Sequence, residues 1–262
     1  MKRWIALLCC LALLCLAMTA GAEEIIRYVP AEQPLPFLDQ PDSLWVFTMP
    51  IGAQDAFLIV CEGHAMMLDC GAIGREPQER LLLELLDALH IDRFDYVINT
   101  HPHTDHYAGF EALLRQVPAG ELLTCFPEDY DRKQAALLKA VRELNIPIRH
   151  YHEGETLALG GARIDTWRFH EIDNTNDLSL VARVQYGERS ILLTADIGLT
   201  AQRKLAEAAG PRWRSDVLKM PHHGVGKPSK AMLEAVQPQL CWVTNIRNDS
   251  CKDTWSYLEK RD

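Results

Sequence analysis

The sequence has 262 residues, with 27 Lys or Arg against 36 Asp or Glu, and its formal net charge is −9. Proteins that bind nucleic acid tightly neutralise phosphates with Lys and Arg. No basic stripe stands out here, so the composition argues against a nucleic acid partner. The length suits one α/β domain with a full hydrophobic core.

The N-terminus has the pattern of an export signal. Two basic residues precede an apolar stretch from Trp4 to Met18, and Ala20-Gly21-Ala22 has the small-x-small pattern that signal peptidase accepts. The stretch is shorter than the roughly 20 residues of a membrane-spanning helix. We therefore predict a cleaved signal peptide over residues 1–22, an extracellular or cell-envelope location, and one domain over residues 23–262. A retained anchor and a lipid anchor at Cys15 are the alternatives.

The first half of the domain alternates between strand and helix patterns. Apolar runs at 44–47 and 56–60 flank a turn with Pro and Gly, which predicts an antiparallel hairpin. Strands are also expected at 65–68 and 94–98, and helices from Tyr107 and over 131–144. A helix over 76–90 is expected to pack in the core through five leucines at helical spacing, Leu81, Leu82, Leu85, Leu86 and Leu89.

The second half repeats this alternation. Strands are expected at 155–159, 162–169, 179–186, 190–194, 216–220 and 240–244, and helices at 199–209, 231–235 and around 255–259. Alternating strands and helices in both halves predict a layered α/β sandwich.

The strongest chemical signal lies where the strand at 94–98 ends and a helix begins. Four side chains that can bind metal fall within six positions: His101, His103, Asp105 and His106. His101 and His103 are two positions apart, so in an extended chain they point the same way and can bind one ion. Asp105 and His106 follow as the chain turns into the helix, and they can diverge to a second ion.

This loop matches the H-x-H-x-D-H signature of the metallo-β-lactamase superfamily, and the resemblance extends over roughly residues 44–241. It implies an α/β fold, the four-layer αββα sandwich of that superfamily. It also implies that Asp196 bridges two metal ions at the end of a strand, and that Asp69 accepts hydrogen bonds that fix the histidine loop. In Pro221-His222-His223-Gly224, either His222 or His223 is implied as a ligand of the second ion. The other histidine would contact substrate, donate a proton or pack.

One part departs from the superfamily pattern. Many members have a further histidine ligand before the bridging aspartate, whereas this chain has an Asn/Asp-rich turn that begins at Asp173. That turn resembles the branch with the hydrolase domains of DNA-uptake competence proteins and phosphorylcholine esterases. Asn176 or Asp177 is expected to line the site, and His170 is the competing candidate. An oxygen ligand would leave the first ion more open, so we expect two divalent ions, zinc first, with manganese or iron as alternatives.

The C-terminus is a second departure from that branch. Its members continue past the helix around 255–259 into a further strand, whereas this sequence stops at Asp262. We expect a domain with a trimmed C-terminal edge or a shortened chain.

The resemblance implies an exported hydrolase that uses a metal-bound hydroxide as nucleophile, with Asp105 orienting it and His222 or His223 protonating the leaving group. The branch points to phosphate esters, either small molecules or envelope polymers, acted on by a monomer without a membrane span after cleavage. The alternatives are a lactam or thioester hydrolase, a nuclease, which the acidic balance disfavours, and a non-catalytic metal-stabilised surface module.

Overall fold

The computed structural model describes residues 12–15, 27–30, 42–49, 52–71, 78–130, 132–152, 154–171, 174–245 and 248–260. The predicted signal peptide lies outside these residues except for strand β1 (Ala12–Cys15), which pairs antiparallel with β2 (Arg27–Pro30). Asp173 of the Asn/Asp-rich turn also lies outside them. Within the described ranges, no helix has the length and apolar character needed to span a membrane.

The first half of the domain forms one sheet of six strands in sequence order. These are β3 (Leu44–Thr48), β4 (Ala56–Cys61), β5 (His64–Cys70), β6 (Phe94–Asn99), β7 (Ala119–Thr124) and β8 (Ile148–His150). The expected hairpin is confirmed, because β3, β4 and β5 are antiparallel, and β5 to β8 are parallel. The helices of this half are α1 (Gln78–Ala88), α2 (Thr104–Tyr107), α3 (Phe110–Leu114) and α4 (Arg132–Glu143).

The second half forms a second sheet of six strands, in the order β14-β13-β12-β11-β10-β9. The strands are β9 (Thr156–Leu159), β10 (Ala162–Trp167), β11 (Val181–Tyr186), β12 (Arg189–Leu193), β13 (Val217–Lys219) and β14 (Leu240–Trp242). Strands β9 to β12 are antiparallel and β12 to β14 are parallel. The helices are α5 (Leu199–Ala209), α6 (Lys230–Val236) and α7 (Lys252–Leu258). Short 3-10 turns at Gly210–Trp213, Pro221–Gly224 and Asp249–Cys251 join these elements.

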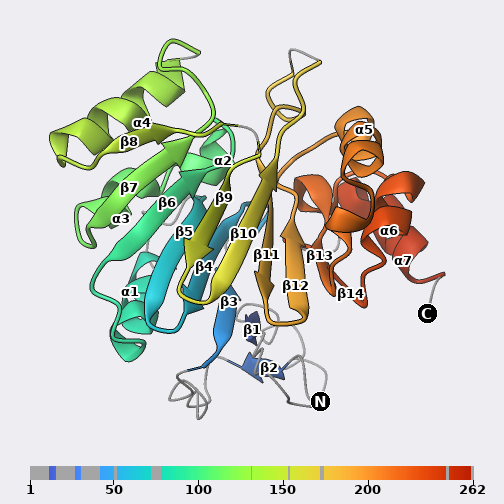
Figure 1. Ribbon diagram of the computed structural model, residues 1–262, viewed down its shortest axis with the longest axis horizontal. Helices are drawn as coiled ribbons and strands as arrows, with labels where there is room; N and C mark the ends of the chain where they lie inside the picture. The colour runs from blue at the N-terminus through green and yellow to red at the C-terminus, as the bar shows by residue number, and fades with distance from the viewer. Residues whose placement is uncertain are drawn as a thin grey trace.

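Three buried clusters show that these elements stack in four layers. Alternate residues of β4 face opposite ways: Leu58 packs with the leucines of α1, whereas Ile59 packs with Ile164 and Val184 of the other sheet. A third cluster joins β12 and β13 to α5 and α6. Figure 1 shows the resulting order, with α1, α3 and α4 outside the first sheet and α5, α6 and α7 outside the second. The expected αββα sandwich is therefore confirmed.

The loops that carry the candidate metal ligands lie at one edge of the two sheets. The histidine loop follows β6, Asp196 comes shortly after β12, and the His222-His223 pair follows β13. All three strands belong to the parallel parts of their sheets, where carboxyl ends meet at a common edge. Loops from both halves of the chain therefore reach one place.

Candidate metal centre

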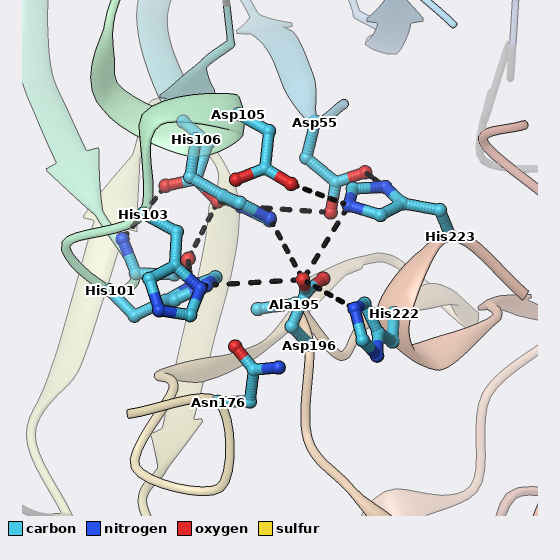
Figure 2. A network of polar contacts seen from close by, with 12 residues as sticks. Asp55, His101, His103, Asp105, His106, Asn176, Ala195, Asp196, His222 and His223 are labelled. Atoms are coloured by element: carbon cyan, nitrogen blue, oxygen red, sulfur yellow. Dashed lines mark hydrogen bonds and ion pairs between the residues drawn. The ribbon is translucent and has the colours of Figure 1, made fainter. Parts of the chain in front are cut away.

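The side chains expected from the sequence converge between the two sheets, and Figure 2 shows them facing a common point. The converging residues are His101, His103, Asp105, His106, Asp196, His222 and His223. His101, His106, Asp196 and His223 are buried, whereas His222 is partly exposed.

Asp196 lies at the middle of this cluster. Its Oδ2 is 3.2 Å from Nε2 of His106 and 3.5 Å from Nε2 of His223. The same oxygen is 3.7 Å from Nε2 of His222 and 3.9 Å from Nε2 of His101. One carboxylate oxygen thus faces four imidazole nitrogens, which is the placement expected of a carboxylate shared between cations.

Hydrogen bonds fix which nitrogen each histidine presents. Nδ1 of His106 donates to Oδ2 of Asp69 at 2.6 Å. The Thr100 hydroxyl also donates to Oδ2 of Asp69, at 2.6 Å, so its oxygen is left to accept from Nδ1 of His101 at 3.1 Å. Because both Nδ1 atoms are engaged as donors, the Nε2 atoms are the ones left to bind a cation: Nε2 of His106 faces Asp196, and Nε2 of His101 lies 3.1 Å from Nδ1 of His103. Asp69 therefore accepts hydrogen bonds from both Thr100 and His106.

Buried atoms without hydrogen bonds mark where a cation fits. Nε2 of His106, Nε2 of His223 and both carboxylate oxygens of Asp196 are buried and make no hydrogen bond. Buried polar atoms rarely stay without a partner, and a divalent cation would satisfy all of these. One ligand atom from each of Asp55, His106, Asp196 and His223 lies within 4.8 Å of the others. The residues present therefore fit a divalent metal, and imidazole with carboxylate suits zinc, manganese or iron.

The two neighbouring histidines occupy different environments. His223 is 2% exposed, and its Nε2 lies 3.5 Å from Oδ2 of Asp105 as well as from Asp196. Burial lowers the pKa of His223, but the carboxylates of Asp55, Asp105 and Asp196 outweigh burial and raise it to about 10. The side chain of His222 is 41% exposed, and partial burial holds its pKa below the ordinary value. His223 thus has the position of a ligand, and His222 faces the opening of the site.

The sequence pattern of the Metallo-beta-lactamase superfamily matches residues 49–238. The chain belongs to this superfamily. It is 26% identical over 181 residues to ComE operon protein 3 of Bacillus subtilis (strain 168), covering 65% of this chain and 22% of that protein. It is 28% identical over 185 residues to competence protein ComA of Neisseria gonorrhoeae, covering 70% of this chain and 24% of that protein. The expected resemblance to the DNA-uptake competence branch is confirmed, and the chain spans less than a quarter of these relatives.

A solved structure is also similar in fold. CmlA, a diiron beta-hydroxylase from Streptomyces venezuelae, matches with a TM-score of 0.52 at 17% identity, over 80% of this chain and 50% of that chain. At this identity the likeness shows a shared fold alone.

The departure from the common metallo-β-lactamase pattern is resolved in part by the Asn/Asp-rich turn. Oδ1 of Asn176 is buried without a hydrogen bond, and Figure 2 shows this side chain pointing towards the cluster. Oδ1 of Asp177 instead accepts from the backbone N–H of Gly198 at 2.7 Å, which fastens the turn to the start of α5. His170 is exposed. Of the three candidates, Asn176 has the side chain that faces the centre.

Asp55 is a site residue that the sequence analysis missed. It is fully buried directly before β4, where its Oδ1 accepts from the Thr244 hydroxyl at 2.8 Å and from Nδ1 of His223 at 3.1 Å. Asp55 therefore orients His223 in the same way that Asp69 orients His106. Its signal in the sequence was an aspartate just before an apolar strand, which is also the pattern of an ordinary turn.

The backbone around the centre is strained. Asp69, Ala195, His222 and His223 have φ values of 55°, 45°, 50° and 53°, in the left-handed region that non-glycine residues rarely adopt. Such conformations persist where the surrounding structure fixes them, and they gather at functional sites. The turn that follows the two histidines needs a glycine at position 224, because a Cβ there would lie 2.8 Å from Cγ1 of Val243.

Proposed function

We propose that this chain is an exported, divalent metal-dependent hydrolase of phosphate esters. The observation that carries the proposal is the buried carboxylate of Asp196, which faces four imidazoles. A basic pocket adds to it, because some of its lining residues are close to Asp196 and His223 in the sequence. Members of the metallo-β-lactamase superfamily are metal-dependent hydrolases, which supports the reaction class.

Two kinds of residue would serve hydrolysis. His101, His103, Asp105, His106, Asp196 and His223 would hold two divalent ions, with Asn176 beside the first. When bound, such ions supply a water of lowered pKa as nucleophile and neutralise the charge that develops on the attacked group.

Asp105 and His222 would act on the reacting groups. The side chain of Asp105 is 37% exposed, and although burial raises its pKa, His223 and His106 hold the pKa below the ordinary value, so the carboxylate is ionised at neutral pH. It can accept a hydrogen bond from the attacking water and orient it. His222, on the open side, can donate a hydrogen bond to the leaving oxygen through its neutral imidazole.

A basic pocket supports phosphate esters as the substrate class. Four cationic side chains line it, and no acidic side chain does; its lining is Leu199, Arg203, Lys227, Pro228, Ser229, Lys230, Ala231, Tyr257 and Lys260. Leu199 follows Asp196 by three positions and Lys227 follows His223 by four, so their Cα atoms lie within roughly 11 Å and 15 Å of these residues. In a chain of net charge −9, such a pocket would attract an anionic substrate to this part of the surface.

The test pairs metal analysis with turnover. We expect divalent metal in the purified protein and hydrolysis of bis(p-nitrophenyl) phosphate that chelation abolishes and metal addition restores. Asp105→Ala should lose this turnover while the protein stays folded. Bound metal with turnover of a lactam or thioester but not of the phosphodiester would replace this proposal with the lactam or thioester hydrolase. If the protein binds metal but the wild type and Asp105→Ala show the same residual turnover, a metal-stabilised surface module is favoured.

A second candidate is hydrolysis of single-stranded nucleic acid at the cell envelope. It is favoured by the similarity to a protein named competence protein ComA and by the same basic pocket. The acidic balance of the chain argues against it. Turnover of a single-stranded oligonucleotide with a steep dependence on salt would select this candidate over a small-molecule or envelope-polymer ester.

A further inference from the structure

Lys219 is a buried cation directly behind the metal centre. It ends β13 with no exposed surface, and its Nζ forms an ion pair with Oδ2 of Asp55. The same ammonium donates to the carbonyl of Ala195 at 2.8 Å and lies 3.7 Å from Oδ1 of Asp196. Burying an ammonium costs free energy unless it is paired and hydrogen-bonded, so Lys219 depends on these contacts.

The first set of contacts leads from Lys219 to His223. Asp55 shares its carboxylate between the two, with Oδ2 at Lys219 and Oδ1 at Nδ1 of His223. The backbone N–H of Asp55 also donates to the carbonyl of Asp105 at 3.1 Å. Lys219 therefore holds the carboxylate that turns His223 towards Asp196.

The second set of contacts leads to Asp196 itself. The carbonyl of Ala195 accepts from Lys219 and also from the backbone N–H of His222, at 3.0 Å. Ala195 is one of the residues with positive φ, so this carbonyl is turned from its usual direction. Lys219 thereby ties the strained turn before Asp196 to the strained turn at His222.

We propose that Lys219 is a positioning residue that acts as a fixed internal cation and sets the ligands of one of the two metal ions. That ion is the one that Asp105, His106, Asp196 and His223 would hold. The ammonium of Lys219 contacts Asp55, Ala195 and Asp196 rather than His101 or His103, so the other ion depends on it less. The inference rests on the proposed function only in requiring two divalent ions.

The sign of the effect separates positioning from simple charge repulsion. Lys219→Met removes a positive charge close to a cation site, so Coulomb repulsion alone predicts tighter metal binding. Positioning predicts the opposite, because residues that orient metal ligands contribute about 10- to 100-fold to metal affinity. We expect calorimetric titration of the metal-free variant with zinc to show one binding step weakened by this factor and the other changed less. Tighter binding, or two unchanged steps, would overturn the proposal.

A double variant keeps the result independent of folding. Asp55→Asn with Lys219→Met leaves no unpaired buried charge, so this double variant should fold even where the single one does not. Its net charge change is zero, and positioning by the Lys219–Asp55 pair predicts that the same step stays at least about tenfold weaker. Wild-type affinity at both steps in the double variant would contradict the role of Lys219.

Arg183→Met is the matched control. The guanidinium of Arg183 is a half-buried cation that donates to the carbonyl of Arg214 at 2.9 Å and to Oγ of Ser190 at 3.0 Å, away from the centre. It should leave both zinc steps unchanged. Because the titration needs no substrate, a wild-type protein that binds two ions without hydrolysing phosphodiesters would defeat the proposed function alone. An active wild type with unaltered zinc binding in Lys219→Met would defeat this inference alone.

Discussion

Nδ1 of His106 lies 2.6 Å from Oδ2 of Asp69, with both side chains fully buried. This contact directs the other ring nitrogen of His106 at Asp196, 3.2 Å away. Asp69→Ala should therefore weaken metal binding by about 10- to 100-fold and lower turnover accordingly. Elemental analysis after dialysis against limiting zinc checks this. Asp87→Ala, on the exposed side of α1, is the control that should keep its metal. Full metal content in Asp69→Ala would refute the orienting role.

The metal-free protein should lose stability as pH rises. The pKa of His223 is raised from 6.5 to about 10, so its protonated form stabilises the fold fully below about pH 6.5, and this contribution disappears between about pH 6.5 and pH 10. Thermal midpoints of chelator-treated protein across this range should fall, and His223→Gln should reduce the fall. Metal uptake should show the reverse trend, because His223 must release its proton to bind a cation. A flat stability profile would contradict the ion pairing with Asp55.

The two neighbours in the Asn/Asp-rich turn should behave differently. Asn176→Ala should lower turnover with little change in stability, because its buried oxygen makes no hydrogen bond within the protein. Asp177→Ala leaves the N–H of Gly198 without its acceptor, and we expect a loss of about 1–3 kcal/mol in the free energy of unfolding. Urea unfolding and initial rates on both variants provide the comparison. The opposite pattern would exchange the roles of the two residues.

Charge removal in the basic pocket should act on substrate binding. Lys227→Gln with Lys230→Gln should raise KM for an anionic phosphodiester about 3- to 10-fold and leave kcat nearly unchanged, since exposed charge pairs each contribute at most about 1 kcal/mol. The effect should shrink at high salt. Lys204→Gln, on α5 but outside the pocket, is the control. An equal change in KM for Lys204→Gln would show that only net charge matters.

The sequence was informative where signals are local. His101 to His106 form one short loop, so their chemistry could be read directly, and the bounds of α5 were predicted from 199 to 209 as observed. Strands β7 and β8 were not predicted. The first half of β7 is only partly buried and includes Gly120, and β8 has three residues without full burial, so neither carries a clear alternation.

The missed site residues are those that act over long separations. Asp55 and His223 are 168 positions apart, and Asp55 and Thr244 are 189 apart. No pattern near Asp55 in the sequence predicts its contacts with His223 and Thr244. Lys219 offered a weak signal, a lysine at the end of an apolar parallel strand, where charged residues are rarely buried.

The hydrogen bonds of Asp55 with His223 and Thr244 also determine when the metal site can assemble during synthesis. During synthesis the N-terminal half emerges first, with the histidine loop and Asp69. His223 and Thr244 come from the last quarter of the domain, so the second set of ligands is assembled only when nearly all of it has left the ribosome. The protein can therefore bind its full set of metal ions only after this last quarter has been synthesised. A shorter chain has at most the histidine ligands of the first half.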